Sequence, residues 1–150
     1  EIIENQKRMK KSLVNDKKIE DKFGVSMNIG YGYEYDTVKD KFIWLRKEFQ
    51  SGYNSILIYE VPIESVEKNQ DIVQNIINIR DSIGKANIHG MLPNTWMITE
   101  EAYAPYLFET KLDNKFTYLA KGTWVLKNDF MAGPFLNYTV IDKKQSLSNC

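Results

Sequence analysis

The chain has 150 residues, which is enough for one domain with a hydrophobic core of its own. Its 20 basic and 20 acidic residues cancel, so it has no surplus of positive charge to neutralise a nucleic-acid backbone. Apolar residues make up 43% of the sequence, which excludes wholesale disorder. No apolar run approaches the roughly 20 residues of a bilayer-spanning helix. The composition therefore predicts a globular domain that neither binds nucleic acid nor crosses a membrane.

The two ends of the sequence contain few features that indicate a location or a function. Residues 1–4 (EIIE) include neither an initiator Met nor a signal-peptide pattern, so we expect that the chain was processed or cut from something longer. The only cysteine, Cys150, is the last residue, which excludes a disulfide within the chain. We expect Cys150 to be a free thiol.

The first part of the sequence predicts one helix followed by three strands. Residues 1–22 are dense in helix-forming residues, and Gly24 stands where a C-terminal cap is expected. Residues 25–35 alternate between large side chains and small or polar ones, which is typical of a half-buried strand. A turn is expected next, through residues 36–41. Two further strands, joined as a hairpin, are expected at residues 42–49 and 55–61.

The second part predicts one long helix and four strands. In residues 64–83, isoleucines recur every three or four positions and form a wide apolar stripe, which is typical of a helix lying on a sheet. Gly84 is expected to end this helix, and residues 87–94 form a turn-rich connection. The strands are expected at residues 95–99, 106–112, 116–126 and 135–141.

The order of these elements predicts the fold class. The strands come in hairpins rather than alternating with helices, which favours an α+β fold: an antiparallel sheet of hairpin-connected strands packed against two helices. There is no internal repeat, low-complexity tract or linker, so residues 1–150 are expected to form a single α+β domain.

Residues for catalysis or metal binding are scarce. His89 is the only histidine, which disfavours a zinc site or an oriented nucleophile–histidine pair. Gly30 and Gly32 continue a predicted strand and therefore do not form a phosphate-binding loop. We assign no catalytic residue, no metal ligand and no cofactor. Asp129 or the pair Glu100-Glu101 leaves an acid-dependent hydrolase as an alternative.

Two aromatic segments are the candidate binding sites. Tyr31, Tyr33 and Tyr35 share one face of a predicted strand, where they either stack on a ligand such as a sugar ring or pack the inner face of the sheet. Residues 122–135 crowd aromatic side chains around a turn that contains Gly133-Pro134. Either this segment folds a packed hydrophobic corner, or it offers an aromatic loop to a partner. Its candidate residues are Trp124, Asp129 and Phe130.

The segment GTWVLKNDFMAGPFLNYT, residues 122–139, resembles the most recognisable part of domain of unknown function 4837, an uncharacterised Bacteroidetes family. Arg80-Asp81-Ser82 followed by residues 85–88 (KANI) resembles the end of the second helix in that family. One departure is Ala132, where the family prefers Gly. The family pattern also continues past the strand at residues 135–141 with another strand and a closing helix. The resemblance therefore implies that this chain is the C-terminal half of a family member, without its beginning and its last elements.

The resemblance implies a location rather than an activity. Members of this family are lipoproteins, which implies a lipid-anchored parent protein at the periplasmic face of the cell envelope. The family has no established activity. We therefore expect a non-catalytic envelope domain with a structural or partner-binding role, and small-ligand or glycan binding on an aromatic sheet face is the first alternative. The strand at residues 135–141 is expected at a sheet edge, where it could pair in a homodimer.

Overall fold

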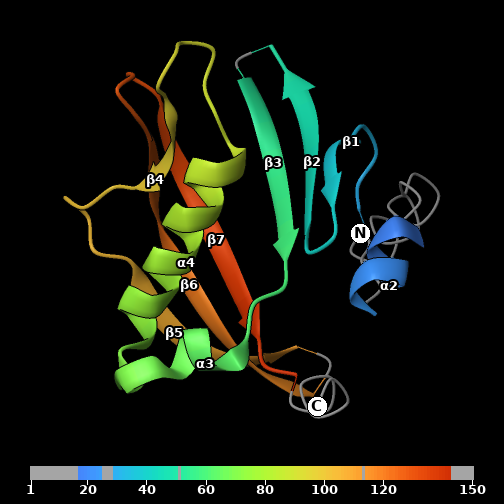
Figure 1. Cartoon of the computed structure of the whole chain (residues 1–150), viewed down its shortest axis with the longest axis vertical. Helices are drawn as coiled ribbons and strands as arrows, with labels where there is room; N and C mark the ends of the chain where they lie inside the picture. Colours follow the sequence, from blue (N-terminus) through green and yellow to red (C-terminus); the bar gives the residue numbers. More distant parts are fainter. Residues whose placement is uncertain (1–16, 25–28, 51, 113, 143–150) are drawn as a thin grey trace, which may run out of the picture. The chain divides into compact units, whose positions relative to one another are not determined.

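The computed structural model describes residues 17–24, 29–50, 52–112 and 114–142, and the chain divides into two units (Figure 1). Unit 1 is Glu1–Val61 and unit 2 is Pro62–Cys150. Each unit contains its own antiparallel sheet, so the predicted α+β class is confirmed, with two sheets in place of one. The expectation of a single domain stays a prediction.

Unit 1 is a three-stranded sheet, in the order β1-β2-β3, with one described helix. The elements are α2 (Lys17–Phe23), β1 (Glu34–Lys39), β2 (Phe42–Phe49) and β3 (Gly52–Tyr59). The predicted hairpin of β2 and β3 is confirmed, with Phe49 paired to Gly52 beside the turn. α2 ends at Phe23 and Gly24 follows as its cap, as predicted: the φ of Gly24 is +68° and its N–H donates to the carbonyl of Glu20 at 2.9 Å. Residues 1–16 of the predicted first helix lie outside the described residues.

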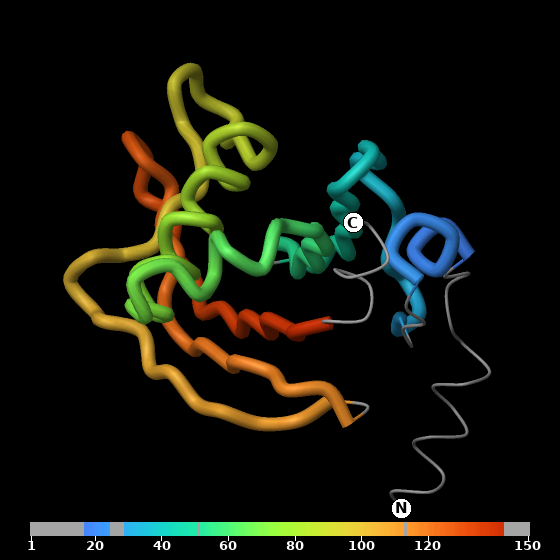
Figure 2. The backbone as a smooth tube through the Cα atoms, turned by 60° about the horizontal axis from the view of Figure 1, so that its bottom comes forward, coloured from blue at the N-terminus to red at the C-terminus, as the bar shows by residue number. Residues whose placement is uncertain are grey.

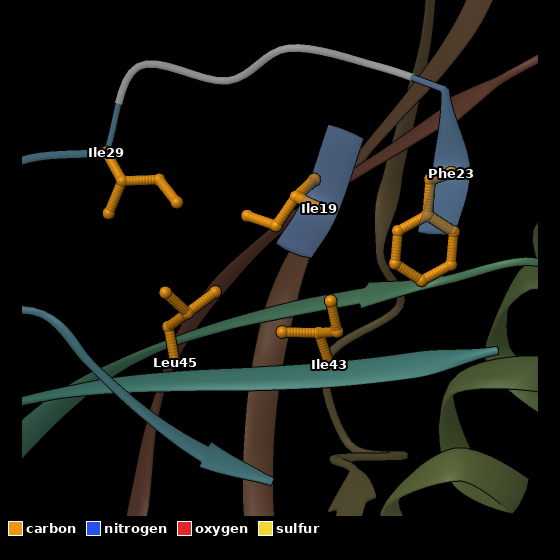
Figure 3. Close-up of a cluster of buried hydrophobic side chains, with 5 residues drawn as sticks. All are labelled: Ile19, Phe23, Ile29, Ile43 and Leu45. Carbon is orange, nitrogen blue, oxygen red and sulfur yellow. The ribbon is translucent and has the colours of Figure 1, made fainter. Parts of the chain in front are cut away.

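The core of unit 1 lies between α2 and the sheet. Ile19 and Phe23 point from α2 towards Ile43 and Leu45 of β2, and Ile29 completes the cluster (Figure 3). All five side chains are buried. Ile43 and Leu45 lie two positions apart on β2 and so share the face of the strand that the helix covers.

The predicted strand over residues 25–35 is wrong in most of its described part. Residues 25–28 lie outside the described residues, residues 29–33 are not strand, and a turn is formed at Tyr31 and Gly32. Gly32 has a φ of +94°, a conformation that glycine adopts without strain and that interrupts an extended chain. The strand β1 begins only at Glu34, and it runs through much of the predicted turn to Lys39.

Unit 2 contains two α-helices, a short 3₁₀ helix and a four-stranded antiparallel sheet. Its elements are α3 (Ile63–Glu67), η1 (Lys68–Gln70), α4 (Ile72–Asn87), β4 (Trp96–Thr99), β5 (Tyr106–Leu112), β6 (Lys115–Lys127) and β7 (Ala132–Val140). The long strand β6 pairs along one edge with β7 and along the other first with β5 and then with β4. All four strands lie close to their predicted positions. Within the described part of unit 2, β7 is an edge strand.

The predicted helix over residues 64–83 is interrupted and also extended. Asn69 and Gln70 have positive φ values of 55° and 59°, which breaks the helix between α3 and α4. Asp71 then begins α4 by accepting a hydrogen bond from the N–H of Gln74. Gly84 does not end the helix, which continues for three more residues to Asn87. Asparagine tolerates left-handed backbone well, which is why the break falls here without a Gly or Pro.

α4 covers one face of the sheet of unit 2 (Figure 2). Ile76 of α4 packs against Ala120 of β6 and Phe135 of β7, and these three residues are buried. Around them pack the partly buried side chains of Ile72, Leu107, Tyr118 and Trp124. Among the described helices, none is long and apolar enough to cross a membrane.

Candidate functional site

Two glycine–aromatic pairs join β6 to β7. Gly122 lies opposite Phe135, and Trp124 lies opposite Gly133. A Cβ atom on Gly122 would come within 2.6 Å of the Phe135 ring, and one on Gly133 within 2.8 Å of the Trp124 indole. Each ring therefore occupies the space that a side chain on the opposite glycine would need. These residues of the Gly122–Phe135 segment are consequently packing residues.

Arg80 extends this packing to the helix. It lies on α4 and is only 7% exposed. Its guanidinium carbon lies 3.6 Å from the centroid of the Phe135 ring, at stacking distance. A cation over an aromatic face is stabilised most where water is excluded. Arg80 therefore holds α4 against β7, through the ring that also fills the space over Gly122.

Asp81 and Gly84 hold α4 against β4. One oxygen of Asp81, Oδ1, accepts hydrogen bonds from the backbone N–H and the hydroxyl of Thr99, at 2.7 and 2.9 Å. Gly84 faces the backbone of Met97 so closely that an added Cβ would overlap the Met97 carbonyl oxygen. The segment from Arg80 to Gly84 is therefore a helix–sheet contact, and of the Arg80-Asp81-Ser82 run only Ser82 is exposed.

The turn between β6 and β7 separates packed residues from exposed ones. Asn128 has a φ of 67°, and Oδ1 of Asp129 accepts a hydrogen bond from the N–H of Phe130 at 2.7 Å. Asp129 is half-buried, whereas the side chain of Phe130 is fully exposed and that of Met131 is exposed. Trp124 and Phe135 thus pack, while Phe130 projects into solvent, and an interaction of this turn with a partner stays a prediction.

A second loop lies beside this turn and also exposes apolar side chains. The side-chain amide of Asn128 donates to the carbonyl of Asn94 at 2.9 Å, which joins the β6–β7 turn to the loop before β4. In that loop Met91 is 95% exposed and Leu92 is exposed as well. Both loops lie at the top of unit 2 in Figure 1. We call Met91, Leu92, Phe130 and Met131 together the apolar tip.

The face of the sheet opposite α4, which we call the outer face, is rich in exposed aromatic side chains. Residues paired across antiparallel strands share a face, so Tyr106 with Lys121 and Phe108 with Leu119 lie on this side. Exposure is 73% for Tyr106 and 60% for Leu136. We use the name for one part of this side, which consists of Tyr106, Phe108, Leu119, Lys121, Leu136, Tyr138 and Val140; Thr117, which pairs with Val140 on the same side, is buried. Sequence reasoning missed it, although Tyr106/Phe108 and Leu136/Tyr138/Val140 alternate with a period of two.

The three candidate tyrosines of unit 1 do not present one common surface. Tyr31 is exposed in the turn before β1. Tyr33 and Tyr35 are partly buried and pack against the core cluster of α2 and β2. Lysine side chains contact both of these rings: the ammonium of Lys18 lies 4.8 Å from the centroid of Tyr35, and that of Lys47 lies 6.0 Å from that of Tyr33. A stacking role for these tyrosines stays a prediction.

The carboxylates and the histidine have local partners. Oε1 of Glu100 accepts a hydrogen bond from the N–H of Ala102 in the turn after β4. Asp142 forms an ion pair with Lys115 at 3.1 Å. Nε2 of His89 lies 2.8 Å from the carbonyl of Lys85 and can donate to it. Among the described residues no group of three or more histidines, cysteines and carboxylates is placed to hold a metal ion.

One titration is perturbed near the helix side of the sheet. Burial raises the pKa of the Tyr118 hydroxyl above its ordinary value of 10.0, and the negative charges of Glu67 and Glu109 raise it further. A tyrosine with a raised pKa stays neutral at physiological pH, so this shift indicates packing rather than an activated phenolate.

The comparisons with known proteins identify a family without an assigned activity. A family model described as "Domain of unknown function (DUF4837)" matches residues 12–148. No curated protein and no solved structure matches the chain. Since the match covers nearly the whole sequence, the Gly122–Phe135 segment and the Arg80–Gly84 contact are features of a member of that family. The chain belongs to the DUF4837 family.

Proposed function

We propose that this protein is a non-catalytic domain of the cell envelope that binds a protein partner through the outer face of unit 2. The observation that supports it best is the contrast between the two sides of one sheet. The side under α4 is packed, whereas the outer face leaves Tyr106, Phe108, Leu136 and Tyr138 exposed. Contiguous exposed apolar surface of this kind marks interaction sites in folded proteins.

The chemistry of the outer face fits an apolar protein surface. Tyrosine and phenylalanine are enriched in the buried centres of protein interfaces, and charged residues are depleted there. Lys121 lies among these aromatic residues, with its ammonium 5.4 Å from the centroid of the Phe108 ring, and β6 places Lys115 and Lys127 on the same side at its two ends. A partner with an apolar patch and an acidic residue at its rim would complement it. The cell-envelope location is proposed from the lipoproteins of the family, which also suggest a lipid-anchored parent protein.

The test compares variants of the outer face with a matched exposed tyrosine elsewhere. Tyr106→Ser with Leu136→Ser removes the two most exposed hydrophobic side chains of the outer face, and Tyr103→Ser changes a 68% exposed ring in the loop between β4 and β5. A partner captured by chemical cross-linking is purified, and its affinity for each variant is measured by calorimetry. We expect the double variant to bind at least tenfold more weakly and the control to bind normally.

Three results would argue against this proposal. One is an affinity that the double variant leaves unchanged. Another is early melting of the double variant, because this would place its side chains in a core. A third is binding of glycans, but of no protein, by the outer face; this would favour the ligand-binding alternative, for which the exposed rings of Tyr106 and Tyr138 also provide stacking surfaces.

A further inference from the structure

We infer that the apolar tip inserts into the surface of an anionic lipid bilayer. The tip consists of Met91, Leu92, Phe130 and Met131, which project from two neighbouring loops of unit 2. Phe130 is fully exposed and Met91 is 95% exposed, so neither contributes to the core. Side chains that protrude in this way need a surface that deforms around them, and the interfacial region of a bilayer does so without a matching pocket.

Part of the backbone of the two loops is hydrogen-bonded within the protein. In the loop before β4, the hydroxyl of Thr95 donates to the carbonyl of Leu92 at 2.6 Å, and the side chain of Asn128 donates to the carbonyl of Asn94. Unsatisfied backbone groups are costly in an apolar phase, so internal pairing lowers the cost of insertion.

The same holds for the turn between β6 and β7. The N–H of Phe130 donates to the carboxylate of Asp129, and the carbonyl of Met131 accepts from the N–H of Leu126 at 2.9 Å. The carbonyls of Leu92, Asn94 and Met131 and the N–H of Phe130 are thus paired within the protein. A protein partner would more often use such groups for hydrogen bonds across its interface.

The residues directly behind the tip match the boundary of a membrane. Trp96 begins β4 and pairs across the sheet with Lys127, and the ammonium of Lys85 lies 5.3 Å from the centroid of the Trp96 ring. Tryptophan is enriched at the level of lipid head groups, and lysine favours anionic ones. Residues 85–96 and 127–131 contain three charged side chains, Lys85, Lys127 and Asp129. The acidic one, Asp129, accepts a hydrogen bond from the N–H of Phe130.

The test uses the full chain and two kinds of vesicle. Flotation is measured with vesicles of phosphatidylglycerol and phosphatidylethanolamine and with vesicles of phosphatidylcholine alone. We expect binding to the anionic vesicles, with quenching of tryptophan fluorescence by brominated lipid. Phe130→Ser should lower the partition coefficient about tenfold, because it removes one large apolar side chain from the lipid. Lys85→Gln with Lys127→Gln should lower it about tenfold as well, and only for the anionic vesicles.

Two controls separate this inference from the proposed function. Tyr103→Ser removes an exposed ring in the loop at the other end of β4 and should leave flotation unchanged. Tyr106→Ser with Leu136→Ser should abolish partner binding but not flotation, so failure of either idea leaves the other intact. Absence of binding to both vesicle types would overturn the inference. The inference would also be overturned if the Phe130→Ser variant bound vesicles as strongly as the parent chain does, or if this substitution weakened binding to the protein partner instead.

Discussion

Replacing Gly84 by alanine tests how closely α4 approaches β4. Gly84 is buried in the middle of a helical turn, and its backbone needs no conformation that alanine lacks. At an open helix position this change stabilises a protein by about 1 kcal/mol. Here the added Cβ would overlap the carbonyl oxygen of Met97 and lie 3.1 Å from its carbonyl carbon. The structure therefore predicts the opposite sign.

The size of the loss in stability depends on which of the colliding atoms can move. Overpacking a core costs about 1–3 kcal/mol, and the cost is greatest where no side chain can rotate away. The atoms that collide belong to the backbone of β4, so α4 itself must shift, which favours the upper end of that range. After the gain in helix propensity, the net loss is about 2 kcal/mol. For a chain of this size that corresponds to a Tm lower by about 4–8 °C.

Thermal unfolding followed by tryptophan fluorescence measures this loss. In a Trp44→Phe background the remaining tryptophans, Trp96 and Trp124, both report on unit 2. Ser82→Ala is the matched control, because Ser82 is an exposed residue of the same helix. A Gly84→Ala protein that melts at or above the parent temperature would refute the reasoning, since α4 could not then lie so close to β4.

Three other changes test separate contacts. Gly133→Ala should destabilise unit 2 by about 1–2 kcal/mol, because its Cβ would meet the rigid ring of Trp124. Denaturant unfolding measures this loss, and an unchanged free energy of unfolding would contradict the packing of Trp124 over Gly133. Asp81→Ala should cost about 2–3 kcal/mol in the same assay, since it leaves the buried N–H of Thr99 without its acceptor, and a loss below about 0.5 kcal/mol would contradict that role. The raised pKa of Tyr118 means that the unfolded chain loses this proton first, so the free energy of unfolding should fall as the pH rises above about 10. Tyr118→Phe should reduce that slope, and an identical slope would argue against the shift.

Much of the fold could be predicted because its signals are local. The short connections between apolar segments suffice to place most strands, and β2 and β5 begin and end at the predicted residues. The strand predicted from alternation over residues 25–35 is the one that failed, because Gly32 interrupts it. The helix break at Asn69 and Gln70 could not be predicted, since it depends on left-handed asparagine and glutamine, which compositional rules do not flag. Gly84 shows the reverse error. A glycine at the end of an apolar stripe suggests a helix end, whereas here it permits contact with a strand that is distant in sequence.

The candidate site was predicted less well, and for a different reason. The sequence shows which aromatic side chains surround a turn, but not which of them find a neighbour. Trp124 and Phe135 find space to pack because glycines lie opposite them on the partner strand. Phe130 lies in the turn between those strands, and its side chain is fully exposed. The exposure of Tyr106 and Leu136 likewise depends on which side of the sheet α4 covers, a choice made by tertiary packing.

The two glycine–aromatic pairs also determine how β6 and β7 can align. In the observed alignment each large ring lies opposite a glycine, which has no side chain to occupy the same space. A slip of two residues, which would keep every side chain on its own face, brings Trp124 opposite either Phe135 or Met131. In the first case two rings compete for one space, and in the second Gly122 meets Gly133 and leaves a void. Alternative alignments of this hairpin are thus penalised by shape alone. A strand pair that ends in an exposed turn can therefore hold Phe130 in one place without any contact to Phe130 itself.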